Sequence, residues 1–107
     1  MKTLKLDVLD RLMLPQLLPQ SGGKIEMLMV ETIVKKIDFT ADEISEFGLN
    51  DANGMVKWTS SRDVDFEFTQ EQVEMMKKSA RKADEEGKVT RHNLPVIEKI
   101  ESLNNSI

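Results

Sequence analysis

Two capping boxes show where helices begin, and they limit the fold more than any other feature of the sequence. A threonine stands three residues before a glutamate at 40–43 and three residues before a glutamine at 69–72. In this pattern each side chain accepts a hydrogen bond from a backbone N–H at the helix start. Gly48 and Gly87 are the residues at which we expect the two segments to end. The predicted helices cover 41–47 and 70–86.

Three further helices are predicted from apolar residues at the helical period. The most apolar of them covers 24–37 and carries two neighbouring apolar stripes, which is typical of a helix that is either central in the core or shared between a core and an interface. A first helix over 9–18 begins after Asp7 and is interrupted by Pro15, and a last helix begins after Thr90. On the helix 24–37 we expect one stripe to face the core: Ile25, Leu28, Met29, Ile33 and Ile37.

Alternation of polar and apolar residues predicts the strands. The segment 63–68 alternates without interruption, so its three apolar residues share one face. We expect it to pair with 55–58 as a β-hairpin. The alternation over 4–8 offers a further strand that either joins this sheet or stays apart from it.

The order of these elements predicts an α+β fold with about five helices and a small antiparallel β-hairpin sheet, two- or three-stranded. A strand, three helices and a hairpin also give the chain a winged-helix-like element order. We expect one domain over 1–103, followed by a tail at 104–107 that frays. In a winged helix the segment 41–47 would be the recognition helix, but it carries three acidic residues and no basic one, which disfavours binding of DNA through it.

Composition excludes several classes of function. The 107 residues include no cysteine, which rules out disulfides and thiolate chemistry, and a single histidine, His92, which has no neighbouring partner in the sequence. Charged residues interrupt the N-terminal apolar run, and no apolar stretch approaches the roughly 20 residues of a membrane helix. We therefore expect a cytoplasmic protein with no catalytic residue, no cofactor, no bound metal, no evident small-molecule ligand and no membrane contact.

Several segments resemble a group of small phage and prophage proteins. The likeness covers most of the chain and consists of caps, turns and core positions. It implies a viral or prophage setting and no particular activity. The segments are Leu4–Leu12, Leu17–Gly22, Ile37–Glu43, Val56–Trp58, Lys88–His92 and Val96–Lys99.

Three carboxylates on one face of a strand are the candidate metal ligands. Asp63, Asp65 and Glu67 alternate with apolar residues and could gather a hard cation such as Ca²⁺ or Mg²⁺ in a small metal-dependent hydrolase. Same-face neighbours on a strand lie roughly 7 Å apart, which is too wide for a tight site. We favour the interpretation that the three acids form the solvent face of a half-buried sheet and serve, if anything, as a protein-docking face.

Two further surfaces are candidates for partner contacts. The second stripe of the helix 24–37, together with a methionine of the fourth helix, predicts docking of a protein or a second copy of the chain: Met27, Val30, Val34 and Met75. The outer face of the fourth helix carries a basic ridge formed by four residues: Lys77, Lys78, Arg81 and Lys82. As an alternative to protein docking, this ridge could contact nucleic acid. Ten acidic residues against two basic ones between 38 and 74 would also attract a basic partner. The leading hypothesis is a non-enzymatic interaction or assembly module; a nucleic-acid-associated regulator is the alternative.

Overall fold

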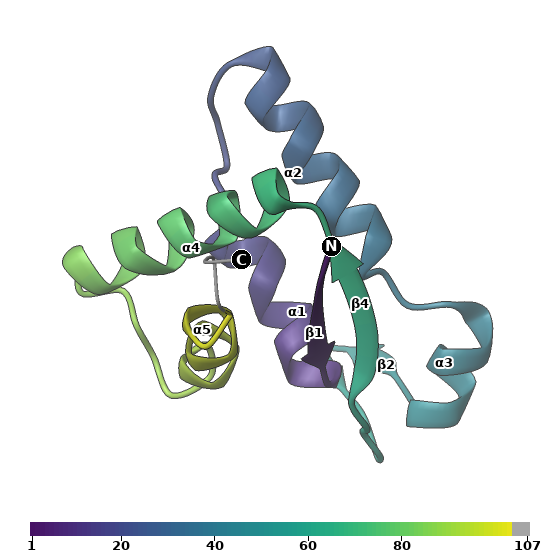
Figure 1. The fold of residues 1–107 in the computed structure, drawn as a ribbon. Helices are drawn as coiled ribbons and strands as arrows, with labels where there is room; N and C mark the ends of the chain where they lie inside the picture. The colour runs from purple at the N-terminus through teal and green to yellow at the C-terminus, as the bar shows by residue number, and fades with distance from the viewer. Residues whose placement is uncertain (104–107) are drawn as a thin grey trace.

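The computed structural model describes residues 1–103 and has an α+β fold (Figure 1). Within that range it contains five helices and two separate antiparallel sheets of two strands each. The predicted frayed tail at 104–107 lies outside the described residues. In chain order the elements are β1 (Lys2–Leu6), α1 (Val8–Leu17), α2 (Lys24–Lys36), α3 (Ala41–Phe47), β2 (Asn50–Ala52), β3 (Met55–Lys57), β4 (Val64–Phe68), α4 (Gln70–Glu85) and α5 (Leu94–Glu101).

Side-chain capping marks the start of three of the five helices in residues 1–103. Both predicted capping boxes are confirmed, at the starts of α3 and α4, and a third box joins Asp7 to Asp10 at the start of α1. Gly48 ends α3 with a φ of 63°, a left-handed conformation that glycine adopts without strain. The last helix begins three residues later than expected, because Thr90 exchanges hydrogen bonds with Asn93 in a preceding turn.

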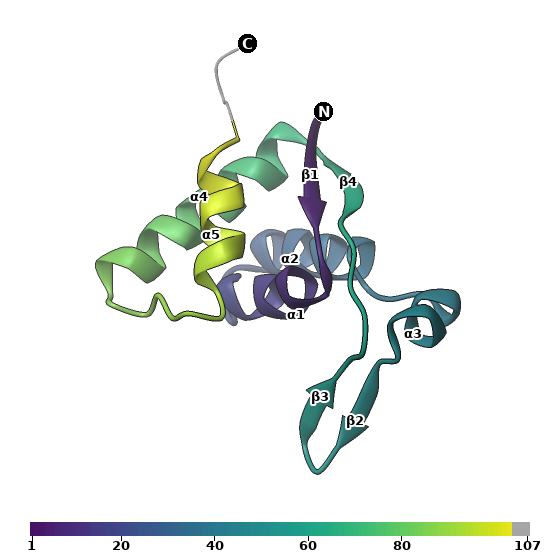
Figure 2. The ribbon, with the colours of Figure 1, turned by 90° about the horizontal axis from the view of Figure 1, so that it is seen from below.

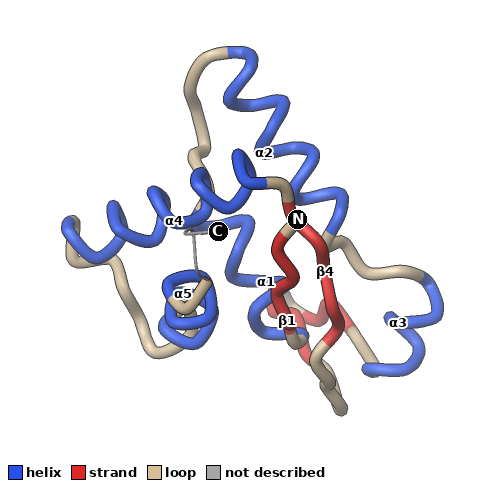
Figure 3. The backbone as a smooth tube through the Cα atoms, in the orientation of Figure 1, coloured by secondary structure: helices blue, strands red, loops and turns tan. Residues whose placement is uncertain are grey.

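The predicted pairing of 55–58 with 63–68 is wrong. The N-terminal strand β1 pairs with β4, with Leu4 opposite Phe66, and Figure 3 shows the two strands side by side. Strand β3 instead pairs with β2 across a tight turn at Asn53 and Gly54, whose φ values of 56° and 76° suit a type I′ hairpin. Strand β2 was not predicted; the other elements occur in the predicted order, but β3 and β4 belong to different sheets.

One hydrophobic core lies where the β1–β4 sheet meets four helices. Both strands and α1, α2, α4 and α5 contribute to it, whereas α3 and the β2–β3 hairpin project away from it (Figure 2). The inward face of α4 is buried and consists of Val73, Met76, Ala80 and Ala83. The largest fully buried side chains of this core include Leu6, Leu14, Leu18, Ile33, Ile37, Phe68, Met76 and Ile100.

The orientation of α2 differs from the prediction. Ile25 and Leu28 were expected in the core but are 76% and 54% exposed, whereas Val30 is buried. The N-terminal half of α2 extends beyond the other helices (Figure 1), and its residues Ile25 and Leu28 are left exposed. The buried face runs between the two predicted stripes, because the helix is apolar around most of its circumference.

Candidate functional site

The three acids predicted on the strand do not form one site. Asp65 and Glu67 are exposed on β4, and the carboxylate of Asp65 pairs with the ammonium group of Lys5 at 3.0 Å. Asp63 lies before the strand and faces Lys99 of α5, with an Nζ–Oδ1 distance of 3.3 Å. The three carboxylates thus have different surroundings: Asp65 and Glu67 are exposed on β4, whereas Asp63 lies outside the strand and faces α5.

Asp63 instead belongs to a cluster with Asp7 and Asp10. One carboxylate oxygen of each residue lies within 4.8 Å of the other two, close enough to share a cation. The ammonium group of Lys99 already approaches this cluster, 2.5 Å from the Oδ2 atom of Asp10. An ammonium ion therefore supplies the positive charge that a metal would otherwise bring, and we assign the cluster to holding α5 against the start of α1.

Burial sets the protonation behaviour of this cluster. Asp10 is only 1% exposed, and burial raises the pKa of its carboxyl group, although the hydrogen bond from Lys99 opposes that effect. Burial would lower the pKa of Lys99, but its hydrogen bonds to Asp10 and Asp63 outweigh this effect, and the pKa is raised. Lys99 therefore stays protonated at neutral pH. Neither group is free to act as a general base, because each is occupied by the other.

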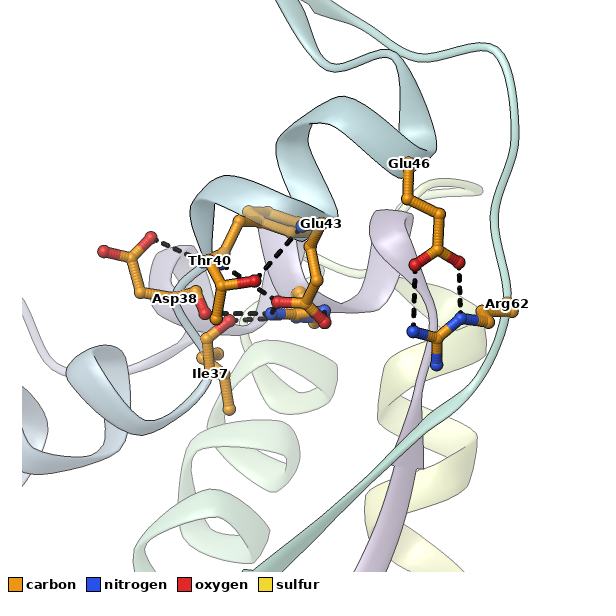
Figure 4. Close-up of polar contacts among 8 residues, drawn as sticks. Ile37, Asp38, Thr40, Glu43, Glu46 and Arg62 are labelled. Carbon is orange, nitrogen blue, oxygen red and sulfur yellow. Dashed lines mark hydrogen bonds and ion pairs between the residues drawn. The ribbon is translucent and has the colours of Figure 1, made fainter.

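A second polar cluster surrounds Arg11, whose side chain is 1% exposed. Its two terminal nitrogens each lie 2.8 Å from an oxygen of Glu43, a bidentate pair. Two further N–H groups donate to the carbonyl oxygens of Ile37 at 3.0 Å and Asp38 at 2.9 Å (Figure 4). Phe39 and Phe66 flank the guanidinium, at 4.1 and 4.9 Å from its carbon to the ring centroids. This cluster joins α1, the segment before α3, and α3 itself.

Glu43 has two roles in this arrangement. Its carboxylate closes the capping box by accepting a hydrogen bond from the backbone N–H of Thr40 at 3.0 Å, and it also pairs with Arg11 (Figure 4). The hydrogen bonds from Arg11 are the main cause that lowers the pKa of Glu43, to about 2, with burial opposing. Only the capping role was visible in the sequence, because Arg11 lies 32 residues away.

The lowered pKa of Glu43 predicts that the folded protein loses stability at acidic pH. Glu43 is an acid whose pKa falls on folding, so its contribution is complete above the unfolded value of 4.5 and is lost as the pH falls toward 2. The difference in unfolding free energy between the natural chain and a Glu43→Gln variant should therefore be constant above about pH 6 and shrink below pH 4.5. Urea titrations from pH 3 to 7 measure it. An equal difference at pH 3 and pH 7 would contradict the ion pair.

The predicted docking stripe on α2 is partly wrong. Val30 is buried in the core and offers no surface to a partner. Met27, Val34 and Met75 are half-buried and pack against the core. Sequence reasoning assigned Ile25 and Leu28 to the interior, yet these are the exposed apolar residues of α2. Their exposure follows from where the helix protrudes, for which the sequence carries no signal.

A groove of about 420 Å³ runs between α2 and α4. Pro19, Met29 and Met75 contribute apolar side chains to it. From α4 it is also lined by two acidic and two basic residues: Glu71, Glu74, Lys78 and Lys82. An adjoining hollow of about 380 Å³ is lined by Ile25, Leu28, Met29 and Glu71 among others. The two hollows share Met29 and Glu71, so exposed apolar and charged groups meet along one continuous surface.

The basic ridge is mostly exposed. Lys78, Arg81 and Lys82 face solvent, and no ion pair among residues 1–103 involves them. Lys77 is half-buried and donates to the carbonyl oxygen of Leu103. His92 lies exposed in the turn before α5.

Comparisons of the chain with protein-family models, curated proteins and solved structures find no match. The resemblance to phage and prophage proteins stays a prediction. In the part of the chain that the structure describes, no helix has the length and apolar character needed to span a membrane.

Proposed function

We propose that this protein is a non-enzymatic interaction module that binds a protein partner along the groove between α2 and α4. The observation that supports this most is the exposure of Ile25 and Leu28 beside that groove. Exposed apolar residues that adjoin a groove with a polar rim are typical of interaction surfaces. We further propose a cytoplasmic location and a phage or prophage setting, which rest on the sequence.

The polar clusters support a structural rather than a chemical use of the charged residues. Arg11 with Glu43, and Lys99 with Asp10, join elements distant in the chain. Among the described residues no buried side-chain nitrogen or oxygen lacks a hydrogen-bond partner. A catalytic acid or base needs a lone pair or proton directed at a substrate, whereas these groups are directed at one another.

The alternative is a nucleic-acid-associated regulator. The exposed cations Lys78, Arg81 and Lys82 favour it, because phosphate contacts supply most of the affinity for nucleic acid. Two carboxylates on the same helix, Glu71 and Glu74, oppose it by repelling phosphate. We therefore place this function second.

Photo-crosslinking tests the proposal directly. A benzophenone amino acid at position 28, in the organism that encodes the chain, should yield a covalent protein adduct because Leu28 adjoins the proposed contact surface. The matched control carries the same group at Glu98, an exposed position of α5 remote from the groove residues in sequence. Absence of an adduct at position 28, or the same adducts at both positions, would contradict the proposal. An adduct that nucleases remove would favour the alternative.

A further inference from the structure

The charged residues that α4 contributes to the groove change sign along the helix, from acidic in its N-terminal half to basic in its C-terminal half. Glu71 and Glu74 lie in its N-terminal half, Lys78 and Lys82 lie in its C-terminal half, and Met75 lies between the pairs. Spacings of three, four, seven and eleven residues keep these side chains on one stripe of the helix. We call these five residues the α4 stripe.

This order makes the α4 stripe complementary to itself. Consider a second copy whose α4 lies antiparallel to the first, related by a two-fold axis that passes between residues 76 and 77. This axis places Glu71 opposite Lys82 of the other copy. The same operation sets Glu74 opposite the turn that holds Lys78, and Met75 beside Lys78. A two-fold axis repeats every contact, so each pairing occurs twice.

The four charged groups are available for such pairing. Among residues 1–103 no ion pair involves Glu71, Glu74, Lys78 or Lys82, and all four residues are exposed. We infer that the partner bound at the α2–α4 groove is a second copy of this chain, packed through antiparallel α4 helices; this inference rests on the proposed function.

The mixed sign of the stripe is what favours a second copy. A nucleic acid or another surface of one sign would meet two like charges wherever it met two opposite ones, and like-charge contacts are costly. A surface with the same two halves in opposite order meets mainly opposite charges, and a second copy of the chain provides such a surface. Ile25 and Leu28 adjoin the α4 stripe at Glu71, so contact with the other copy would bury their exposed apolar surface.

Charge reversal in both halves of the stripe tests the inference. Sedimentation velocity at low salt and several protein concentrations should show a dimer for the natural chain, weakened by added salt because exposed pairs are screened. The variants K78E/K82E and E71K/E74K should each dissociate at least about tenfold more readily, because like charges then face each other. An equimolar mixture of the two variants should form a heterodimer, and the fourfold variant should regain the natural affinity.

The control variant K57E/R91E changes the net charge by the same amount as K78E/K82E, but on β3 and in the turn before α5. It should dimerise normally. Circular dichroism confirms that each variant is folded. A natural chain that stays monomeric, or a dimer indifferent to the reversals, would overturn the inference. So would a low-salt electrophoretic shift of DNA or RNA that K78E/K82E abolishes.

The mass of the photo-adduct at position 28 separates this inference from the proposed function. An adduct of twice the chain mass is expected. A heavier adduct with a different protein, together with a monomeric natural chain, would refute the second copy and leave the interaction module standing. No adduct at all would refute both.

Discussion

Replacing Glu43 by Gln should lower the free energy of unfolding by about 3 kcal/mol, the lower end for breaking a buried ion pair. Glutamine keeps the shape of the side chain and still closes the capping box at Thr40. The loss arises at Arg11, whose buried guanidinium would keep its bonds to the carbonyl oxygens of Ile37 and Asp38 but lose its counter-charge. Equilibrium unfolding in urea at pH 7 measures the change.

The same helix offers a matched control. Glu46 pairs with Arg62 at 2.6 Å, but both side chains are about half exposed, at 44% and 52%. Solvent screens such a pair, so Glu46→Gln should leave the unfolding midpoint nearly unchanged. If the two substitutions had equal effects, Arg11 would be solvated in solution and the account of its cluster would fail.

Replacing Lys99 by Met should also cost about 3 kcal/mol, because it leaves the carboxylate of Asp10 buried without its cation. Adding Asp10→Asn should restore more than half of the loss, since the neutral amide needs no counter-charge. The exposed pair of Lys5 with Asp65 provides the control, and Lys5→Met should change little.

The loss in the Lys99→Met variant should depend on pH in a defined direction. Without Lys99, only the backbone hydrogen bond from Asp7 still opposes the effect of burial, so the pKa of Asp10 rises further and the folded state holds a proton that the unfolded chain has released. The free energy of unfolding of the variant is then higher at low pH, and it falls as the pH rises through the pKa of Asp10 in the folded state. Unfolding at pH 4.5 and pH 7 should show the smaller loss at pH 4.5. A loss independent of pH, with no rescue by Asp10→Asn, would show that Asp10 is hydrated.

The starts of α3 and α4 and the class of fold were predictable because they depend on short-range interactions. The box of Thr40 with Glu43 joins groups three residues apart, so the sequence around it determines the outcome. The alternation that identified β1 and β4 is likewise local. Their pairing is not local, because Leu4 lies 62 positions before Phe66 and neither segment carries a signal that identifies the strand with which it pairs.

The α2 helix shows a different limit. Its periodicity predicted a helix, but apolar residues occupy most of its circumference, so periodicity could not select the buried face. Ile25 and Leu28 are exposed because the helix extends past the elements that could cover it. The proposed docking groove is therefore a product of packing between α2 and α4.

By itself the sequence determined the starts of α3 and α4, the α+β class and the absence of thiol chemistry. The first two depend on interactions between residues close in the chain, and the third depends only on composition. Only the tertiary structure decided that Arg11 pairs with Glu43 and Asp10 with Lys99, 32 and 89 positions apart. The physical reason is that a charge finds its partner only after the chain has folded back and removed both groups from water. Which ends meet depends on the packing of all the helices together.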